Sequence, residues 1–173
     1  YNLTASIGAA FAAHSKKVIL ITSDGSLQMN IQELQTILNY LLPIKIFVYN
    51  NDGYLSIKLT QNAFFNGNLV GSTPSSGVVL PDMEKIAKAY GYKYYKFASH
   101  TDAEQLMSEA LAGDEPVFCE VMTDPLEVLG PKAASAKRAD GTMVSKPLED
   151  LFPFLDRKEF LDNMLIDPVA DDF

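Results

Sequence analysis

The chain has very few of the residue types that hold small metal or disulfide scaffolds together. Its 173 residues include one cysteine, Cys119, and two histidines, His14 and His100. One cysteine excludes a disulfide within the chain and a zinc site made of cysteines alone, and two histidines exclude a metal centre with several histidine ligands. Stability must therefore come from an ordinary core, and 173 residues with 47% apolar content can form one.

Basic residues and long hydrophobic runs are also scarce. The chain has 14 Lys and Arg against 22 Asp and Glu, a formal charge of −8. Nucleic-acid binders need a basic footprint, so we expect no nucleic-acid partner. No apolar run approaches the roughly 20 residues that cross a bilayer, so we expect no membrane partner and a cytoplasmic location. Residues 3–13 already have the composition of a helix, and no methionine or basic leader precedes them. We therefore expect a piece of a longer protein.

Four apolar segments rich in β-forming residues are separated by segments with helical periodicity. The first two are almost continuously apolar, which is typical of strands covered on both faces. Strands that alternate with helices imply crossover connections and a parallel sheet. We predict a doubly wound α/β fold, with a mostly parallel sheet and helices on both faces. The predicted strands are residues 18–22, 44–49, 93–97 and 117–122, and the predicted helices between them are residues 31–41 (with Asn30 as N-cap), 83–90 and 101–111.

The pattern changes near residue 126. Residues 130–150 are rich in Gly, Pro, Ser and Lys without a clear period, and a short amphipathic segment follows over residues 156–165. We predict that residues 1–125 form the main α/β domain. We expect residues 126–173 to be a loop or flap and a short helix of that same domain.

Two polar turns follow the first two predicted strands. Asp24 and Asn51 are 27 residues apart, so both are expected at the carboxyl edge of adjacent parallel strands, where α/β proteins bind ligands. Carboxylate and amide oxygens suit Mg²⁺ or Ca²⁺. Two protein oxygens hold Mg²⁺ poorly, and a diphosphate would supply the remaining ligands. Asp-Gly-Ser and Asn-Asp-Gly are also ordinary turn sequences, so a purely structural role for each turn stays open.

These turns carry a family resemblance. Ser23-Asp24-Gly25-Ser26, followed by Asn50-Asn51, resembles the G-D-G…N-N motif of thiamine diphosphate-dependent enzymes, in the domain that binds the cofactor's diphosphate. Residues 53–65, 81–91 and 115–121 are similar to the acetolactate synthase branch. One departure is Ser23 in place of the first glycine, which a negative φ would allow.

The resemblance implies a set of site residues. Mg²⁺ would be bound by Asp24, the Asn51 side chain and the Gly53 carbonyl. The cofactor would contact these three residues together with Gly25, Ser26 and Tyr54. No catalytic residue is expected in this chain, because the family's activating glutamate belongs to a pyrimidine-binding domain, of the same enzyme or of a neighbouring subunit, that the sequence lacks. The chain alone would then be inactive. We expect a homo-oligomer, a dimer or tetramer. Any FAD of the complete enzyme would be bound outside this chain.

The segment after Asn51 bears on the reaction. Family decarboxylases that release aldehydes carry an acidic residue where this chain has Ile57, which cannot transfer a proton. We therefore expect a carboligase of acetolactate synthase type, which decarboxylates pyruvate and transfers the two-carbon unit to a carbonyl acceptor. Ser56 and Thr60 stand where acetolactate synthases often have methionine and tryptophan, so the acceptor stays open. The alternatives are a 2-oxo acid decarboxylase and a non-catalytic subunit that retains the fold.

Overall fold

The structure, a computed structural model, describes residues 1–14, 16–127, 130–138 and 140–168. It consists of two compact units, residues 1–127 and residues 128–173. Each unit is described by itself below.

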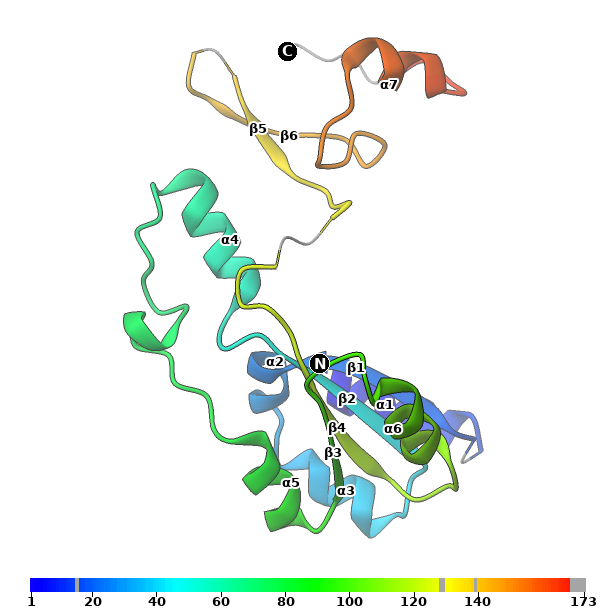
Figure 1. The fold of residues 1–173 in the computed structure, drawn as a ribbon. Helices are drawn as coiled ribbons and strands as arrows, with labels where there is room; N and C mark the ends of the chain where they lie inside the picture. Colours follow the sequence, from blue (N-terminus) through cyan, green and yellow to red (C-terminus); the bar gives the residue numbers. More distant parts are fainter. Residues whose placement is uncertain (15, 128–129, 139, 169–173) are drawn as a thin grey trace. The chain divides into compact units, whose positions relative to one another are not determined.

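The first unit is built on a parallel sheet of four strands in the order β1-β2-β4-β3 (Figure 1). Continuous apolar segments form these strands because both faces of the sheet are largely covered. The predicted boundaries are correct to within one residue, and the predicted fold class is confirmed. The strands are β1 (Val18–Ser23), β2 (Ile44–Asn50), β3 (Lys93–Phe97) and β4 (Val117–Met122).

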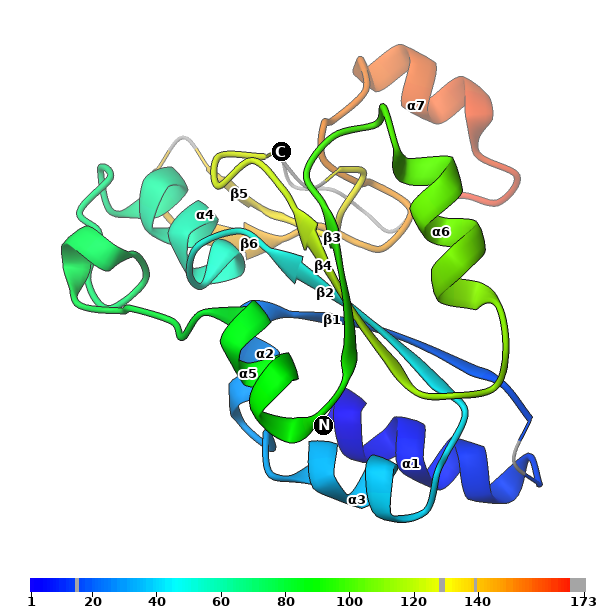
Figure 2. The same cartoon turned by 60° about the horizontal axis from the view of Figure 1, so that its bottom comes forward.

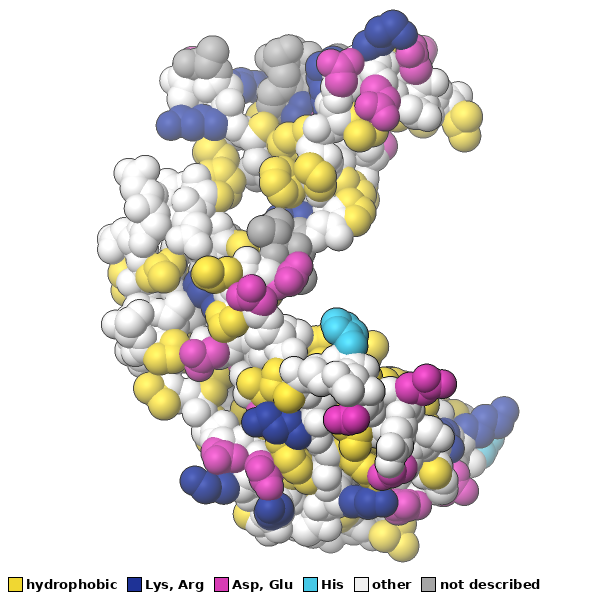
Figure 3. Space-filling view, viewed as in Figure 1, with side chains coloured by type: hydrophobic (Ala, Val, Ile, Leu, Met, Phe, Trp, Pro, Cys, Tyr) yellow, Lys and Arg dark blue, Asp and Glu magenta, His cyan; other side chains and the backbone are white. Residues whose placement is uncertain are grey.

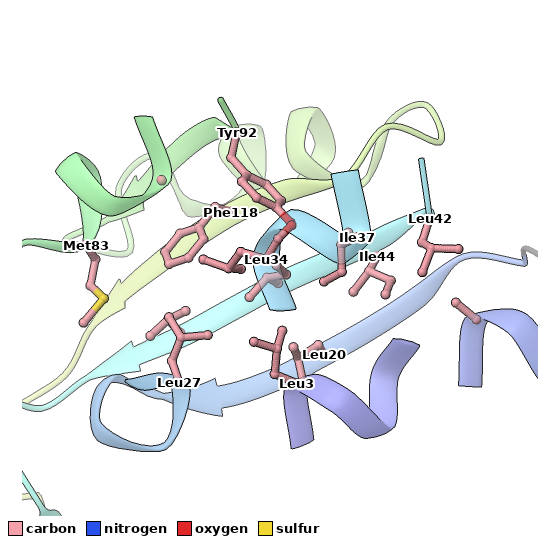
Figure 4. Packing of buried hydrophobic residues seen from close by; sticks show 14 residues of the cluster. Leu3, Leu20, Leu27, Leu34, Ile37, Leu42, Ile44, Met83, Tyr92 and Phe118 are labelled. Carbon is pink, nitrogen blue, oxygen red and sulfur yellow. The ribbon is translucent and has the colours of Figure 1, made fainter. Parts of the chain in front are cut away.

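Helices cover both faces of this sheet (Figure 2). On one face, side chains from the sheet and from α1, α3 and α5 form a core that includes Leu3, Leu20, Ile37, Ile44 and Phe118 (Figure 4). On the other face, α6 closes a smaller core. The helices are α1 (Asn2–Ala12), α3 (Glu33–Asn39), α5 (Met83–Tyr90) and α6 (Ala103–Leu111). The residues of the second core are Phe47, Tyr95, Phe97, Ala110, Val117 and Cys119.

The second face is covered unevenly. Ile19 and Ile21 of β1 belong to this face, and they are 49% and 60% exposed. β1 is also an edge strand of the sheet. On the side of the molecule shown in Figure 3, acidic and basic side chains are interspersed over the region of α3, α5 and α6. Within the described residues, no helix is long and apolar enough to cross a membrane.

The predicted helix over residues 31–41 is shorter than expected. α3 begins at Glu33, and Asn30 is not its cap: the Asn30 carbonyl accepts a hydrogen bond from the Glu33 N–H (2.9 Å), within a turn that precedes the helix. At the other end, Leu41 has a φ of 50° and is exposed. At Leu41 the chain has already turned toward β2. The helical spacing of apolar residues in the sequence therefore extends beyond the end of the helix.

Several short elements were not predicted. Two of them lie at the carboxyl edge of the sheet: α2 starts directly after β1, and α4 follows the turn after β2 (Figure 1). Their mixed polar composition gives no clear periodicity, which explains why the apolar pattern did not reveal them. The elements are α2 (Asp24–Gln28), α4 (Leu55–Phe64) and the 3₁₀ turn η1 (Pro74–Ser76).

In its described residues, the second unit contains a small antiparallel hairpin and the helix α7 (Arg157–Asn163). The hairpin strands, β5 (Ser135–Lys137) and β6 (Met143–Ser145), lie in the segment that was expected to be a loop. Asp150 is almost fully buried in this unit, and two hydrogen bonds from Arg157 (2.8 and 2.9 Å) satisfy its carboxylate. The arginine bonds lower the pKa of Asp150 below its ordinary value.

Candidate functional site

The candidate site begins where β1 ends. Ser23 keeps an extended backbone (φ −114°, ψ 164°), so a serine fits in place of the motif glycine as predicted. Asp24 follows as the first residue of α2, and its side chain is fully buried. One carboxylate oxygen accepts the Gly25 N–H (2.7 Å). The other accepts the N–H groups of Asn51 (3.1 Å) and Gly53 (3.4 Å). The two polar turns therefore meet at this carboxylate.

The turn after β2 is held from several sides. The Asn50 carbonyl accepts hydrogen bonds from the backbone N–H (3.0 Å) and the hydroxyl (3.1 Å) of Thr123. The Asn50 side chain accepts the Asp52 N–H (3.1 Å) and donates to Glu120 (2.6 Å). Asp52 and Gly53 have positive φ values of 56° and 136°. This tight turn directs the N–H groups of residues 51 and 53 toward Asp24.

Two oxygen atoms of the buried residues in this turn have no hydrogen-bond partner among the described residues. The side-chain oxygen of Asn51 is buried and accepts no hydrogen bond, and no described group donates to the Gly53 carbonyl. A buried unpaired acceptor is costly unless a ligand completes it. No group of three His, Cys, Asp or Glu side chains gathers as a metal site in the described ranges. A cation here would need the mixed set of carboxylate, amide and carbonyl oxygens, which suits Mg²⁺.

Burial also affects the charge of the carboxylate. It raises the pKa of Asp24 above the ordinary value of 3.8, while the surrounding N–H donors act in the opposite direction. A cation beside the group would favour the ionised form and offset the cost of burial. The residues present therefore fit a divalent cation.

Two glycines in the site are required by close packing. A Cβ on Gly25 would lie 2.4 Å from the ring of Tyr54, and a Cβ on Gly53 would lie 2.3 Å from the Ser72 carbonyl oxygen. The Tyr54 N–H donates to that same carbonyl (2.9 Å). The tyrosine ring thus covers the start of α2, and the turn after β2 packs directly on the backbone of residue 72.

Comparison with known proteins shows to which family this chain belongs. Residues 1–121 match the family described as "Thiamine pyrophosphate enzyme, C-terminal TPP binding domain". The chain belongs to this family. Thiamine pyrophosphate is thiamine diphosphate, so the family and the cofactor class predicted from the sequence are confirmed.

Several curated relatives are named acetolactate synthase large subunits. The chain is 33% identical to that of Porphyra purpurea over 148 residues, which is 85% of this chain and 25% of the relative. It is 33% identical to the isozyme 3 large subunit of Escherichia coli K12 over 149 residues, 84% of this chain and 25% of the relative. It is 30% identical to the large subunit of Haemophilus influenzae over 151 residues, 87% of this chain and 26% of the relative. The chain spans about a quarter of these relatives' length.

The other predicted residues of this TPP-binding domain lie close to the same turns. Ser26 is in α2, and its hydroxyl accepts a hydrogen bond from the Ser23 hydroxyl (3.0 Å). Ser56, Ile57 and Thr60 all lie on the first two turns of α4 and are exposed, Ile57 by 46%. They are available to a ligand or another domain, and the structure assigns them no contact with the buried part of the site.

Two buried charged residues beside the turn after β2 were missed by the sequence analysis. Glu120 interrupts the apolar strand β4, and it accepts hydrogen bonds from Asn50 and from the Tyr94 hydroxyl. Burial, together with this hydrogen bond, raises the pKa of Tyr94 above its ordinary value. Lys58 of α4 is 3% exposed. The signal for Glu120 was present in the sequence, since a charged residue within a buried strand requires partners. No comparable signal marked Lys58.

Proposed function

We propose that this chain is the cofactor-diphosphate domain of a thiamine diphosphate-dependent carboligase of acetolactate synthase type. The observation that carries the proposal is the unpaired, buried Asn51 side-chain oxygen in the turn whose N–H groups bind the buried Asp24 carboxylate. The similarity to acetolactate synthase large subunits supports the reaction class. The complete enzyme would decarboxylate pyruvate and transfer the two-carbon unit to a carbonyl acceptor.

Each site residue has a distinct role in this proposal. Asp24, the Asn51 side chain and the Gly53 carbonyl would bind Mg²⁺, and the cofactor's diphosphate would supply further oxygen ligands. Gly25 and Ser26 would contact the diphosphate, Ser26 through its hydroxyl. Tyr54 covers the turn at Gly25 and contacts the cofactor. When bound, the thiazolium ring supplies the carbanion chemistry, and these residues bind and orient it.

Ile57 supports carboligation over aldehyde release. An exposed isoleucine on the first turn of α4 cannot deliver a proton to a bound product. Ser56 and Thr60 present hydroxyl groups on the same helix face or close to it, and they are the residues of this chain that would lie nearest the acceptor. A decarboxylase that releases aldehyde is disfavoured by the same residue.

Other parts of the proposed enzyme lie beyond these residues. An activating glutamate comes from a pyrimidine-binding domain of the same enzyme or of a neighbouring subunit, so this chain alone does not turn over substrate. We further propose a homo-oligomer, a cytoplasmic location and a flap function for residues 126–173 within the same domain. FAD, if the enzyme uses it, is bound by a different domain.

Calorimetric titration of the complete enzyme with thiamine diphosphate, with and without Mg²⁺, tests the site. The wild type should bind the cofactor only with Mg²⁺. Asp24→Asn should lose at least the 10- to 100-fold that substitutions beside metal ligands typically cost. Asp102→Asn is the matched control, because Asp102 is exposed and makes no capping hydrogen bond. Equal binding by Asp24→Asn and the wild type would refute the metal site.

Product analysis then separates the alternatives. Incubation of the complete enzyme with pyruvate, Mg²⁺ and cofactor should give the product of carbon–carbon bond formation, with little free aldehyde. Free aldehyde as the main product would assign a decarboxylase. Cofactor binding without turnover of any 2-oxo acid would assign a non-catalytic subunit.

A further inference from the structure

Lys58 is a buried cation next to the candidate metal site. Its side chain extends from the first turns of α4, and the residue is only 3% exposed. Its ammonium group donates to two backbone carbonyls, those of Asn51 (3.2 Å) and Pro125 (2.8 Å). No carboxylate within the described part of the chain forms an ion pair with it. Burying an ammonium group against neutral carbonyls is costly.

The two carbonyls belong to segments that are far apart in the sequence. Asn51 lies in the turn after β2, and Pro125 follows β4. Lys58 therefore ties three segments together: the turn that holds the candidate ligands, the chain leaving β4, and α4. An ammonium group can do this because its three N–H donors radiate from one atom.

The effect on Asn51 is specific. Its N–H is bound by the Asp24 carboxylate (3.1 Å), and its carbonyl is bound by Lys58 (3.2 Å). The main chain of this residue is thus fixed on both sides. Its side-chain oxygen is buried and has no hydrogen-bond partner. With the peptide groups fixed, the direction of the side chain is also restricted.

We propose that Lys58 is a positioning residue for the magnesium site, acting through the Asn51 carbonyl to hold the amide oxygen in the geometry that Mg²⁺ needs. The proposal deepens the proposed function and rests on it. A positioning role for Lys58 makes a prediction that a purely stabilising role does not make. Mg²⁺ requires nearly ideal octahedral geometry, whereas Ca²⁺ accepts irregular geometry and longer bonds. Loss of the Lys58 ammonium group should therefore weaken the binding of Mg²⁺ much more than the binding of Ca²⁺.

The experiment uses Lys58→Met in the complete enzyme, because methionine keeps a similar length and removes the donors. Cofactor binding is titrated calorimetrically at a series of Mg²⁺ or Ca²⁺ concentrations, and thermal unfolding is recorded without metal. Mg²⁺-supported binding should fall by about 10- to 100-fold, as for other residues that support metal ligands. Ca²⁺-supported binding should fall by no more than about threefold. Lys58→Arg, which keeps donors, should recover part of the Mg²⁺ affinity.

The control is Lys85→Met, a lysine of α5 whose side chain is 84% exposed. It should change neither metal affinity. Equal losses for Mg²⁺ and Ca²⁺ in Lys58→Met, or unchanged binding with either metal, would overturn the positioning role. If Lys58→Met does not fold, Lys58→Gln takes its place, and the same two outcomes apply. A wild-type enzyme that binds no cofactor with Mg²⁺ would refute the proposed function instead, so the two failures are distinguishable.

Discussion

A series of glycine substitutions can separate the two constraints that the structure places on Gly53. Its φ of 136° is unfavourable for any residue with a side chain, and an added Cβ would lie 2.3 Å from the Ser72 carbonyl oxygen. Gly91 ends α5 with a φ of 94° but has open space around it, and Gly8 in α1 has neither constraint. Substitution of Gly53 should therefore carry both the backbone cost and the clash, and substitution of Gly91 only the backbone cost. Substitution of Gly8 should carry neither.

The expected magnitudes follow from these differences. Gly8→Ala should stabilise the protein by about 0.5–1 kcal/mol, because it removes a glycine from a helix. Gly91→Ala should cost about 1–2 kcal/mol for the left-handed backbone. Gly53→Ala should cost about 1–3 kcal/mol for the backbone and a further 1–3 kcal/mol or so for the displaced carbonyl, roughly 2–6 kcal/mol in total.

Urea unfolding of the three variants measures these free energies, and each kcal/mol should shift the melting temperature by about 2–4 °C. Cofactor titration of the complete enzyme supplies a second readout, since Gly53→Ala should also abolish Mg²⁺-dependent binding while the other two variants retain it. If Gly53→Ala costs no more than Gly91→Ala, the close contact with Ser72 is not a real constraint and the reasoning is refuted.

Three further predictions follow from the site and its surroundings. Burial raises the pKa of Asp24, so ionisation of this carboxylate destabilises the metal-free fold as the pH rises above the ordinary pKa of 3.8. Mg²⁺ binds the ionised carboxylate. Mg²⁺-dependent cofactor binding, measured by calorimetry, should therefore weaken as the pH is lowered towards about 4. Ile57→Glu should change stability by less than about 0.5 kcal/mol, because the side chain is largely exposed, and it should increase the fraction of free aldehyde in a pyruvate assay; an unchanged product ratio would contradict the role given to Ile57. Tyr94→Phe should cost about 1–3 kcal/mol in urea unfolding, because it leaves an oxygen of the buried Glu120 carboxylate without its phenol donor; unchanged stability would contradict this prediction.

The strands were the part of the fold that the sequence specified most directly. β3 and β4 have the predicted boundaries, and β1 and β2 extend one residue further. Buried parallel strands are almost continuously apolar, so their limits coincide with the polar turns. The same reasoning predicted that Asp24 and Asn51 would meet, because β1 and β2 pair in parallel and end at the same edge.

The remaining features depended on contacts that periodicity does not record. The five residues of α2 include Gly25 and Ser26 and have no amphipathic repeat, and their helical form depends on the site itself. Asn30 is of a residue type common at N-caps, but it lies in a turn that precedes the helix. Lys58 has the residue type of a solvated helix position and is buried, because its ammonium group donates to the carbonyls of Asn51 and of Pro125, which is 67 residues away. Such tertiary partners are outside the reach of local patterns.

The uneven covering of the sheet has a practical consequence for handling this protein. β1 is an edge strand, and no described strand pairs with its outer edge. Its exposed isoleucines, Ile19 and Ile21, add an apolar surface beside that edge. Strands of this kind are templates for self-association. Preparations of the isolated 173-residue polypeptide should therefore scatter light increasingly with concentration, and a charged substitution such as Ile21→Lys should keep them monodisperse without disturbing the opposite edge of the sheet.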